Sequence, residues 1–254
     1  MLRSLYIAGT GMITERSKMD VITNNIANME TVGYKKDQMI SRSFADLLLD
    51  QIDSDDPYVV NTRDEVGPLN TGTHMDVVVT DFTQGALEST EQDTDLAIQG
   101  DGYFSILTPQ GIRYTRSGNF AVDSNGDLVT QEGYYVLGQD GGRLHVGTDG
   151  FSVSSTGTVE AGGQAVGSIR LVAFEDETVL RKTGENLYTT LNNTQPTMAT
   201  TATIKQGYLE ASNVDMATEM VDMLSTNRAY ESNQRIVKMV DESLGKTVND
   251  IAKF

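Results

Sequence analysis

The sequence predicts an α+β protein, in which a long helix at each end flanks a central, glycine-rich, all-β domain. Two observations lead to this prediction. Apolar residues recur every seven positions near both ends of the chain, which is typical of an apolar stripe on a helix. Between the ends, short runs rich in Val, Ile, Phe, Tyr and Thr are separated by glycine-containing turns, which is typical of strands.

The first helix is expected within residues 1–35, which end in a turn. Its stripe comprises Leu5, Met12, Met19 and Ile26. Asparagine side chains compete with the helix by bonding to nearby backbone groups, so Asn24, Asn25 and Asn28 are expected to end the helix near Met29, and an interface role for them stays open.

The second helix is expected within residues 212–254, beginning after Ser212. Its stripe is unbroken over Met216, Met223, Tyr230, Val237, Leu244 and Ile251. The column four residues further on is polar in the middle, at Asn227, Gln234 and Asp241, and polar seam positions fix register at a cost in stability.

The two stripes bury too few side chains to offset the conformational entropy of ordering both helices. Both ends are therefore expected to order when subunits stack. Packing of each helix on its own domain is the alternative.

Between the helices we expect a short helix and acidic connector over residues 36–70, the β domain over 71–188, and a Thr-rich connector with a return strand over 189–211. Hairpin turns are predicted at Asn125-Gly126, Asp140-Gly141 and Asp149-Gly150. Residues 120–126 and 151–157 share Phe, Val, Ser and Gly at matching places, which predicts two similar hairpins.

Composition excludes several classes of function. The chain has 19 Lys and Arg against 36 Asp and Glu, a formal charge of −17, which argues against nucleic acid and anionic membrane surfaces as partners. It has no Cys and two His, which excludes thiolate chemistry, disulfides and Cys/His zinc sites. No apolar stretch is long enough to span a membrane. The N-terminal residues 1–12 resemble a weak secretory signal, but we do not expect them to be a signal peptide.

Several local motifs resemble functional sites, but a structural role explains each of them better. Gly100-Asp101-Gly102 lacks the third glycine and the helix of a dinucleotide-binding turn. Asp123, Asn125 and Asp127 open like a calcium loop, but Leu128 stands where glycine is needed, so a hairpin turn is predicted. The histidines, His74 and His145, and the helical methionines are expected to be packing or surface residues. We therefore expect no catalytic, cofactor-binding or metal-binding residues.

Five segments resemble the family of flagellar rod and hook axial proteins, in the order found in its distal-rod type. The first is residues 20–28 with Thr31 and the signature residues Gly33, Tyr34 and Lys35. The others are residues 84–104, 114–120, 184–188 and 206–214. The resemblance covers nearly the whole chain and is weaker over residues 50–67 and 245–254.

The resemblance implies a structural subunit and no enzyme. Its helices would pair as a coiled-coil core of a helical tube, with the β domain outside, forming a drive shaft that transmits torque for motility. The subunit would leave the cell through the flagellar type III export apparatus without a cleavable signal peptide, and would lie in the basal body, outside the cytoplasmic membrane. Expected partners are further copies, proximal-rod and hook proteins, and surrounding bushing rings, with no nucleic acid and no membrane insertion.

Three alternatives remain at this point. A proximal-rod or hook protein belongs to the same class. A secreted β-rich adhesin or binding module would be a monomer with ordered ends. A carboxylate-dependent hydrolase rests only on the abundance of Asp and Glu, which usually form a solvated surface.

Overall fold

The computed structural model describes residues 2–52, 63–147, 150–191, 194–199 and 201–251. The protein is α+β, with helices at both ends and a strand-rich middle. The chain divides into two compact units, each described here by itself. The helix unit comprises Met1–Asn25, Asp37–Val79 and Met216–Phe254, and the strand-rich unit comprises Ile26–Lys36 and Thr80–Asp215.

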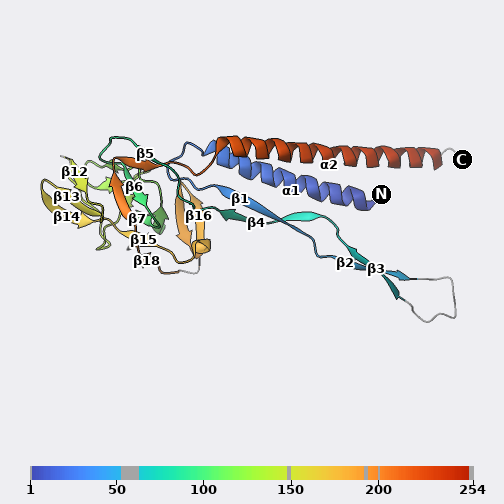
Figure 1. Ribbon diagram of the computed structural model, residues 1–254, viewed down its shortest axis with the longest axis horizontal. Coiled ribbons are helices and arrows are strands. Elements are labelled where there is room, and N and C mark those ends of the chain that lie inside the picture. Colours follow the sequence, from blue (N-terminus) through green and yellow to red (C-terminus); the bar gives the residue numbers. More distant parts are fainter. Residues whose placement is uncertain (1, 53–62, 148–149, 192–193, 200, 252–254) are drawn as a thin grey trace. The chain divides into compact units, whose positions relative to one another are not determined.

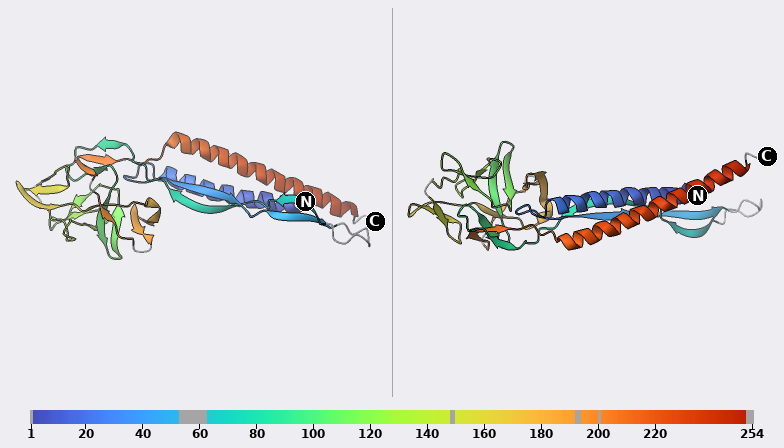
Figure 2. Two further views of the ribbon diagram at one scale, coloured as in Figure 1. Left: turned by 60° about the horizontal axis from the view of Figure 1, so that its bottom comes forward. Right: turned by 90° about the horizontal axis from the view of Figure 1, so that it is seen from above.

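The helix unit contains α1 (Leu2–Ala27) and α2 (Met216–Ile251). These helices lie side by side in Figures 1 and 2. They run antiparallel, because Asn25 near the end of α1 bonds to Glu219 at the start of α2, whereas Gly11 faces Asn233 further along. A Cβ at Gly11 would lie 2.8 Å from the Asn233 amide nitrogen, so the glycine leaves room for that side chain.

The helix unit also contains two antiparallel strand pairs. One joins β1 (Asp37–Ser43) and β4 (Thr73–Thr80), and the other joins β2 (Leu47–Ile52) and β3 (Arg63–Leu69). The short helix expected within residues 36–70 is therefore wrong for the described part of that range. The backbone groups of this segment bond to a partner strand instead. An acidic stretch without a 3.6-residue apolar period also has no apolar face that packing could use to stabilise a helix. Part of the predicted acidic connector, residues 53–62, lies outside the described residues.

The strand pair of β1 and β4 packs on α1. The Thr14 hydroxyl lies 3.3 Å from the Thr73 carbonyl oxygen, and the Tyr6 ring centroid lies 6.5 Å from that of Phe44. The Phe44 ring in turn stacks on His74, at 4.8 Å between centroids. His74 is therefore a packing residue, as the sequence indicated.

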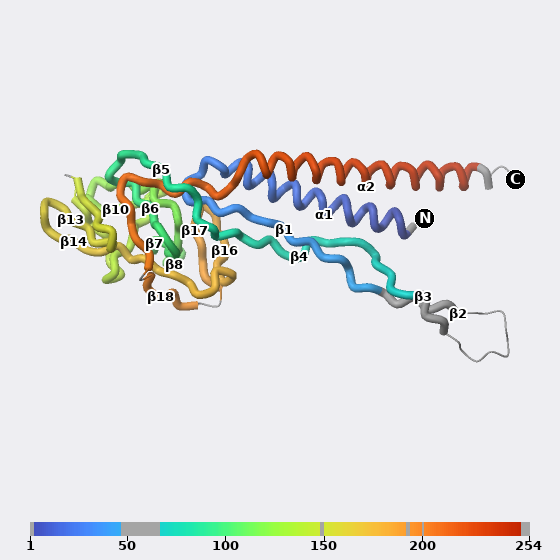
Figure 3. Tube along the Cα trace, in the orientation of Figure 1, coloured from blue at the N-terminus to red at the C-terminus, as the bar shows by residue number. Residues whose placement is uncertain are grey.

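The strand-rich unit is built on a nine-stranded sheet, whose main path is β16-β17-β8-β7-β11-β10-β9 with β15 and β18 attached. Figure 3 labels β7, β8, β10, β16, β17 and β18 of this sheet along the Cα trace. Its strands are β16 (Leu180–Gly184), β17 (Leu187–Thr190), β8 (Gly111–Thr115), β7 (Tyr103–Thr108), β11 (Tyr135–Val136), β10 (Leu128–Val129), β9 (Ala121–Val122), β15 (Leu171–Ala173) and β18 (Thr197–Met198). Smaller sheets join β5 (Leu87–Ser89) to β20 (Tyr208–Glu210), β6 (Leu96–Gln99) to β19 (Thr203–Gln206), and β12 (Phe151–Val153) to β13 (Thr158–Ala161) and β14 (Gln164–Ser168). A 3₁₀ turn, η1 (Glu177–Val179), precedes β16.

Alternation along β7 creates two cores, because successive side chains of a strand point to opposite faces. Phe104 and Ile106 belong to the main core of fifteen buried residues, which also contains Leu96, Ile98 and Val159. Tyr103 enters an aromatic cluster with Tyr114, Val172, Leu180 and Tyr188, which Phe82 and Phe174 flank.

The two repeated segments form the two similar hairpins that the sequence predicted. In the first, the Gly126 amide donates to the Asp123 carbonyl; in the second, Gly157 donates in the same way to Ser154, both at 2.8 Å. Both glycines have positive φ, +83° and +86°. In the first hairpin the Asn125 side-chain amide donates to the Asp123 carboxylate within the turn. Among the described residues, no group of three or more His, Cys, Asp or Glu side chains could hold a metal ion.

Candidate functional site

The signature residues after α1 lie in the strand-rich unit and are buried there. Gly33, Tyr34 and Lys35 are all buried, and the Lys35 side chain is fully so. The Lys35 ammonium lies 2.5 Å from one carboxylate oxygen of Glu210 and donates to the Thr83 carbonyl at 2.7 Å. The signature lysine is therefore an internal ion-pair partner.

Glu210 joins four segments that are far apart in the chain. Its Oε1 also accepts the Gly85 amide at 3.0 Å, its Oε2 lies 3.4 Å from an Arg116 guanidinium nitrogen, and its carbonyl accepts the Gly33 amide at 2.7 Å. Lys35, Arg116 and Glu210, here the buried charge cluster, are each at most 2% exposed. The cluster fastens residues 33–35, 85, 116 and 210 to one another.

The electrostatics of the cluster follow from its burial. Desolvation lowers the pKa of Lys35, and the Glu210 carboxylate opposes that shift without cancelling it. The Arg116 guanidinium lies 5.0 Å from the Tyr103 ring centroid, and the Tyr103 hydroxyl donates to Glu177 at 2.8 Å. Burial raises the pKa of Tyr103, and Glu177 raises it further. With every charge enclosed by packed side chains, the cluster is suited to holding segments together and not to binding a substrate.

Further contacts hold the signature segment in place. The Asn186 amide donates to the Val32 carbonyl at 2.8 Å, and the Lys182 ammonium donates to the Lys35 carbonyl while it lies 4.2 Å from the Tyr34 ring centroid. Gly33 has φ +68°, and a Cβ there would lie 2.5 Å from the Ser117 backbone nitrogen. Only glycine satisfies both conditions.

The three predicted asparagines have different surroundings. Asn25 is buried in the helix unit, where its side chain donates to the Asp37 carbonyl at 2.8 Å and accepts the Asp37 amide at 2.9 Å. It thus ties the end of α1 to the start of β1. Asn28 accepts the Thr31 hydroxyl in the turn after α1, which ends at Ala27, and Asn24 is exposed. Local bonding near the helix end is confirmed for Asn28, whereas Asn25 also bonds to Glu219 of α2 at 3.3 Å.

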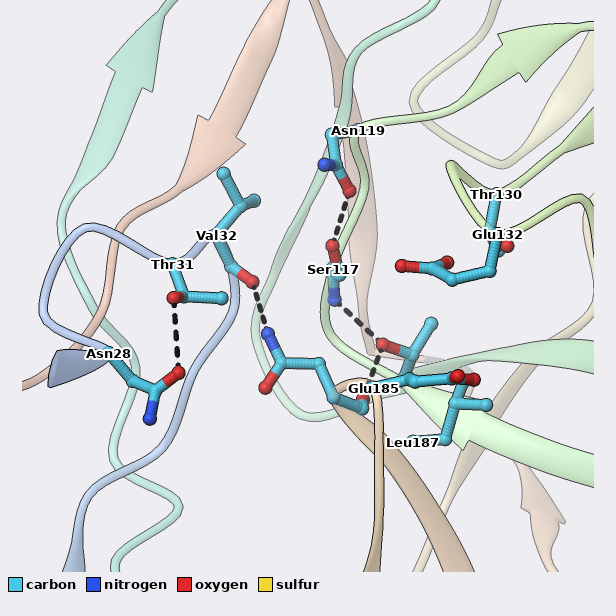
Figure 4. A pocket seen from close by; sticks show the side chains of 11 residues that line it. Asn28, Thr31, Val32, Ser117, Asn119, Thr130, Glu132, Glu185 and Leu187 are labelled. Atoms are coloured by element: carbon cyan, nitrogen blue, oxygen red, sulfur yellow. Dashed lines mark hydrogen bonds between the residues drawn. The ribbon is translucent and has the colours of Figure 1, made fainter. Parts of the chain in front are cut away.

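Residues of three resembling segments line a polar pocket of about 210 Å³ in the strand-rich unit (Figure 4). Its walls include Asn28, Thr31, Ser117, Asn119 and Asn186. Its ionisable side chains are Glu132 and Glu185. The Ser117 hydroxyl bonds to Asn119, so the described lining residues hold no pair of nucleophile and base.

The stripe residues of the helices are mostly half-buried. This holds for Leu5, Met12, Met19, Ile26, Met223, Tyr230, Val237 and Leu244, whereas Met216 is exposed and the side chain of Ile251 lies outside those described. The more buried neighbouring column on α2 lies three residues after the first four stripe positions: Glu219 and Thr226 are buried, and Asn233 and Val240 are half-buried, whereas Thr247, after Leu244, is exposed. The column four residues after, from Met220 to Val248, is exposed.

Large apolar side chains remain exposed on other faces of both helices. Val221, Leu224, Met239 and Val248 of α2 are each between 60% and 65% exposed, and Ile13 of α1 is 69% exposed. No helix among the described residues has the length and hydropathy needed to cross a bilayer.

Arg116 and Glu210 lie in segments that resemble the rod and hook family, but no role was predicted for either residue. The available signal was their placement: each is a lone charge in an otherwise uncharged run, Tyr114-Thr115-Arg116-Ser117-Gly118 and Tyr208-Leu209-Glu210-Ala211-Ser212. Their charges are opposite, and a charge in a buried segment requires a partner.

Three family models match the chain. They are described as flagella basal body rod protein over residues 5–35, flagellar hook protein FlgE/F/G D1 domain over 97–161, and flagellar basal body rod FlgEFG protein C-terminal over 205–251. Together they include the helices, the signature segment and much of the sheet.

Curated relatives match over nearly their whole length. The chain is 38% identical to the flagellar basal-body rod protein FlgG of Bacillus subtilis, over 98% of this chain and 99% of the relative. It is 35% identical to the flagellar hook-basal body complex protein FlhO of the same organism over both full lengths, and 36% identical to the flagellar basal-body rod protein FlgF of Caulobacter vibrioides over 96% and 94%. These relatives are structural flagellar proteins, not enzymes. The chain therefore belongs to the flagellar basal-body rod protein family and is of the FlgG type.

Proposed function

We propose that the chain is a structural subunit of the flagellar distal rod, which polymerises into a helical tube and transmits torque. The observation that carries this proposal is the set of large apolar side chains left exposed on α1 and α2. Exposed apolar surface of this kind marks a site of association.

The burial pattern supports a role for the helices in assembly. The half-buried stripe of α2 is accounted for within the chain, but Val221, Leu224, Met239 and Val248 lie outside it. Covering the part of these four side chains that is still exposed, 60–65% of each, would contribute about 4–8 kcal/mol per subunit, because complete burial contributes about 1.5–3 kcal/mol each. In the tube, we place the stripe residues from Leu5 to Ile26 and from Met216 to Ile251 in a coiled-coil core, which the exposed side chains Val221, Leu224, Met239 and Val248 would join to neighbouring copies.

The buried charge cluster gives the strand-rich unit a fixed internal geometry that a torque-bearing subunit needs. It joins residues 33–35, next to α1, with Glu210, six residues before α2 begins. Force that passes along the chain from α1 or from α2 into the strand-rich unit would therefore reach the same buried contacts.

The relatives' names, flagellar basal-body rod protein and flagellar hook-basal body complex protein, support a location in the basal body. We place the chain in the basal body, outside the cytoplasmic membrane, after passage through the flagellar type III export apparatus. Proximal-rod and hook proteins would contact the ends of the tube, and bushing rings would surround it. A proximal-rod role is the second candidate, because a FlgF protein is 36% identical over nearly the full length.

Polymerisation by the full-length chain tests the proposal. We expect rods or filaments in electron micrographs above a critical concentration, with a rise in helical circular dichroism. Val221→Asp with Leu224→Asp should raise that concentration, whereas the matched control Gln234→Asp, also exposed on α2, should not. A chain that stays monomeric at every concentration would favour the binding-module alternative. Complementation of strains lacking either the distal-rod or the proximal-rod gene separates the two rod positions.

A further inference from the structure

An apolar row crosses four adjacent strands of the nine-stranded sheet. Val129 of β10 pairs with Tyr135 of β11, Tyr135 pairs with Leu107 of β7, and Leu107 pairs with Ile112 of β8. These four residues are the apolar row. Cross-strand partners share a face of the sheet, so their side chains adjoin one another.

The apolar row lies on the face opposite the main core. The sequence neighbours Leu128, Ile106 and Val136 are fully buried in that core, and alternation along each strand turns the row the other way. Leu107 is 36% exposed and Ile112 is 40% exposed. An antiparallel sheet with one solvated face normally carries polar residues at such positions, so this row departs from the expected pattern.

Another part of the same face is covered. There Tyr103 and Tyr114 pack in the aromatic cluster, against Phe82 and Phe174. The apolar row is the continuation of that face along β7 and β8, beyond the aromatic cover. The described residues therefore cover this part of the apolar face only partly: Val129 and Tyr135 are half-buried, and Leu107 and Ile112 stay exposed.

The apolar row also carries a cation. The Arg143 guanidinium lies over the Tyr135 ring, 3.9 Å from its centroid, and Arg143 is exposed. Tyrosine, arginine and large aliphatic side chains together are the composition of the central part of protein interfaces.

We propose that the apolar row is a docking surface for a second copy of this chain, through its strand-rich unit; this rests on the proposed function. The occupant must offer carboxylates to Arg143, and a copy of this acidic chain does so. With 36 acidic against 19 basic residues, another copy presents carboxylates that complement Arg143. A shaft that turns inside other proteins would adhere to them if this row faced outward, so contact between copies is the arrangement consistent with rotation.

Thiol accessibility tests the contact directly. The chain has no cysteine, so Ile112→Cys introduces a single thiol at an exposed position. We expect maleimide to label this thiol in the dilute subunit and at least about tenfold more slowly in the polymer. Equal labelling rates in subunit and polymer would overturn the proposal while leaving the rod assignment intact. Wild-type chain that forms no polymer would instead defeat the proposed function, and this inference with it.

Charge substitution gives the second measurement. Leu107→Asp with Ile112→Asp should raise the critical concentration at least about tenfold, which corresponds to about 1.4 kcal/mol. Val166→Asp is the matched control, because Val166 is 44% exposed in the same unit but lies on β14, outside the row. Unchanged thermal unfolding of the dilute variants establishes that they fold. Equal effects of row and control substitutions, or none, would contradict the proposal.

Discussion

Replacing Glu210 by glutamine removes the one negative charge of the buried charge cluster with little change in shape. Lys35 and Arg116 then remain buried with no carboxylate to bond. Removing one partner from a buried ion pair costs about 3–5 kcal/mol, because the charge left behind stays desolvated. That is a large fraction of the total stability of a domain, about 5–15 kcal/mol.

For a unit of this size we expect Glu210→Gln to lower the unfolding temperature by about 6–20 °C, at about 2–4 °C per kcal/mol. Near-ultraviolet circular dichroism of the dilute protein follows the tyrosines of the aromatic cluster during heating. Glu88→Gln is the matched control, since Glu88 is an exposed carboxylate on β5, which pairs with β20.

A double-mutant cycle makes the reasoning refutable. Lys35→Met with Glu210→Gln should cost less than the sum of the single substitutions, because the second change removes the charge that the first one strands. A loss below about 1 kcal/mol for Glu210→Gln, or additive effects in the cycle, would show that the cluster does not hold the unit together.

Three further predictions concern single positions. Gly33→Ala should lower the unfolding temperature of the dilute protein by more than Gly162→Ala does, because both have positive φ but only Gly33 is crowded; equal losses would contradict the close approach to Ser117. Asn25→Ala should cost the helix unit about 1–3 kcal/mol and speed amide hydrogen exchange at Asp37, with Gln234→Ala, at an exposed position of α2, as the control; unchanged exchange would refute the tie. Burial raises the pKa of Tyr103, so the folded chain keeps a proton that the unfolded chain loses above about pH 10; stability should fall as pH rises beyond that point. Urea unfolding between pH 8 and 11 measures this fall, and Tyr103→Phe should flatten it; an identical slope in that variant would refute the assignment.

The helices and hairpins could be predicted because their signals are local. A seven-residue apolar period over Met216–Leu244 indicates one helical face without knowledge of any partner. Asn125-Gly126 in the first hairpin and its repeat near Gly157 specify turns through glycine at positive φ. These features involve residues within about seven positions of one another.

Other features depended on partners far along the chain. Strands replaced the expected helix within residues 36–70 because β1 pairs with β4, whose position no local pattern reveals. The face of α2 that carries Glu219 and Thr226 was decided by packing in the folded unit, including the bond from Asn25. The side suggested by the sequence, four residues after each stripe position, is exposed.

The sequence by itself determined the period of each helix, the position of two hairpin turns and the resemblance that marks the family. Only the tertiary structure decided that Lys35 meets Glu210 across 175 positions, and that Arg116 joins them. A lone charge in a sequence indicates that a partner is needed if the site is buried. Which residue becomes that partner depends on the path of the chain, because ion pairing acts between atoms a few ångströms apart in space, whatever their separation in sequence.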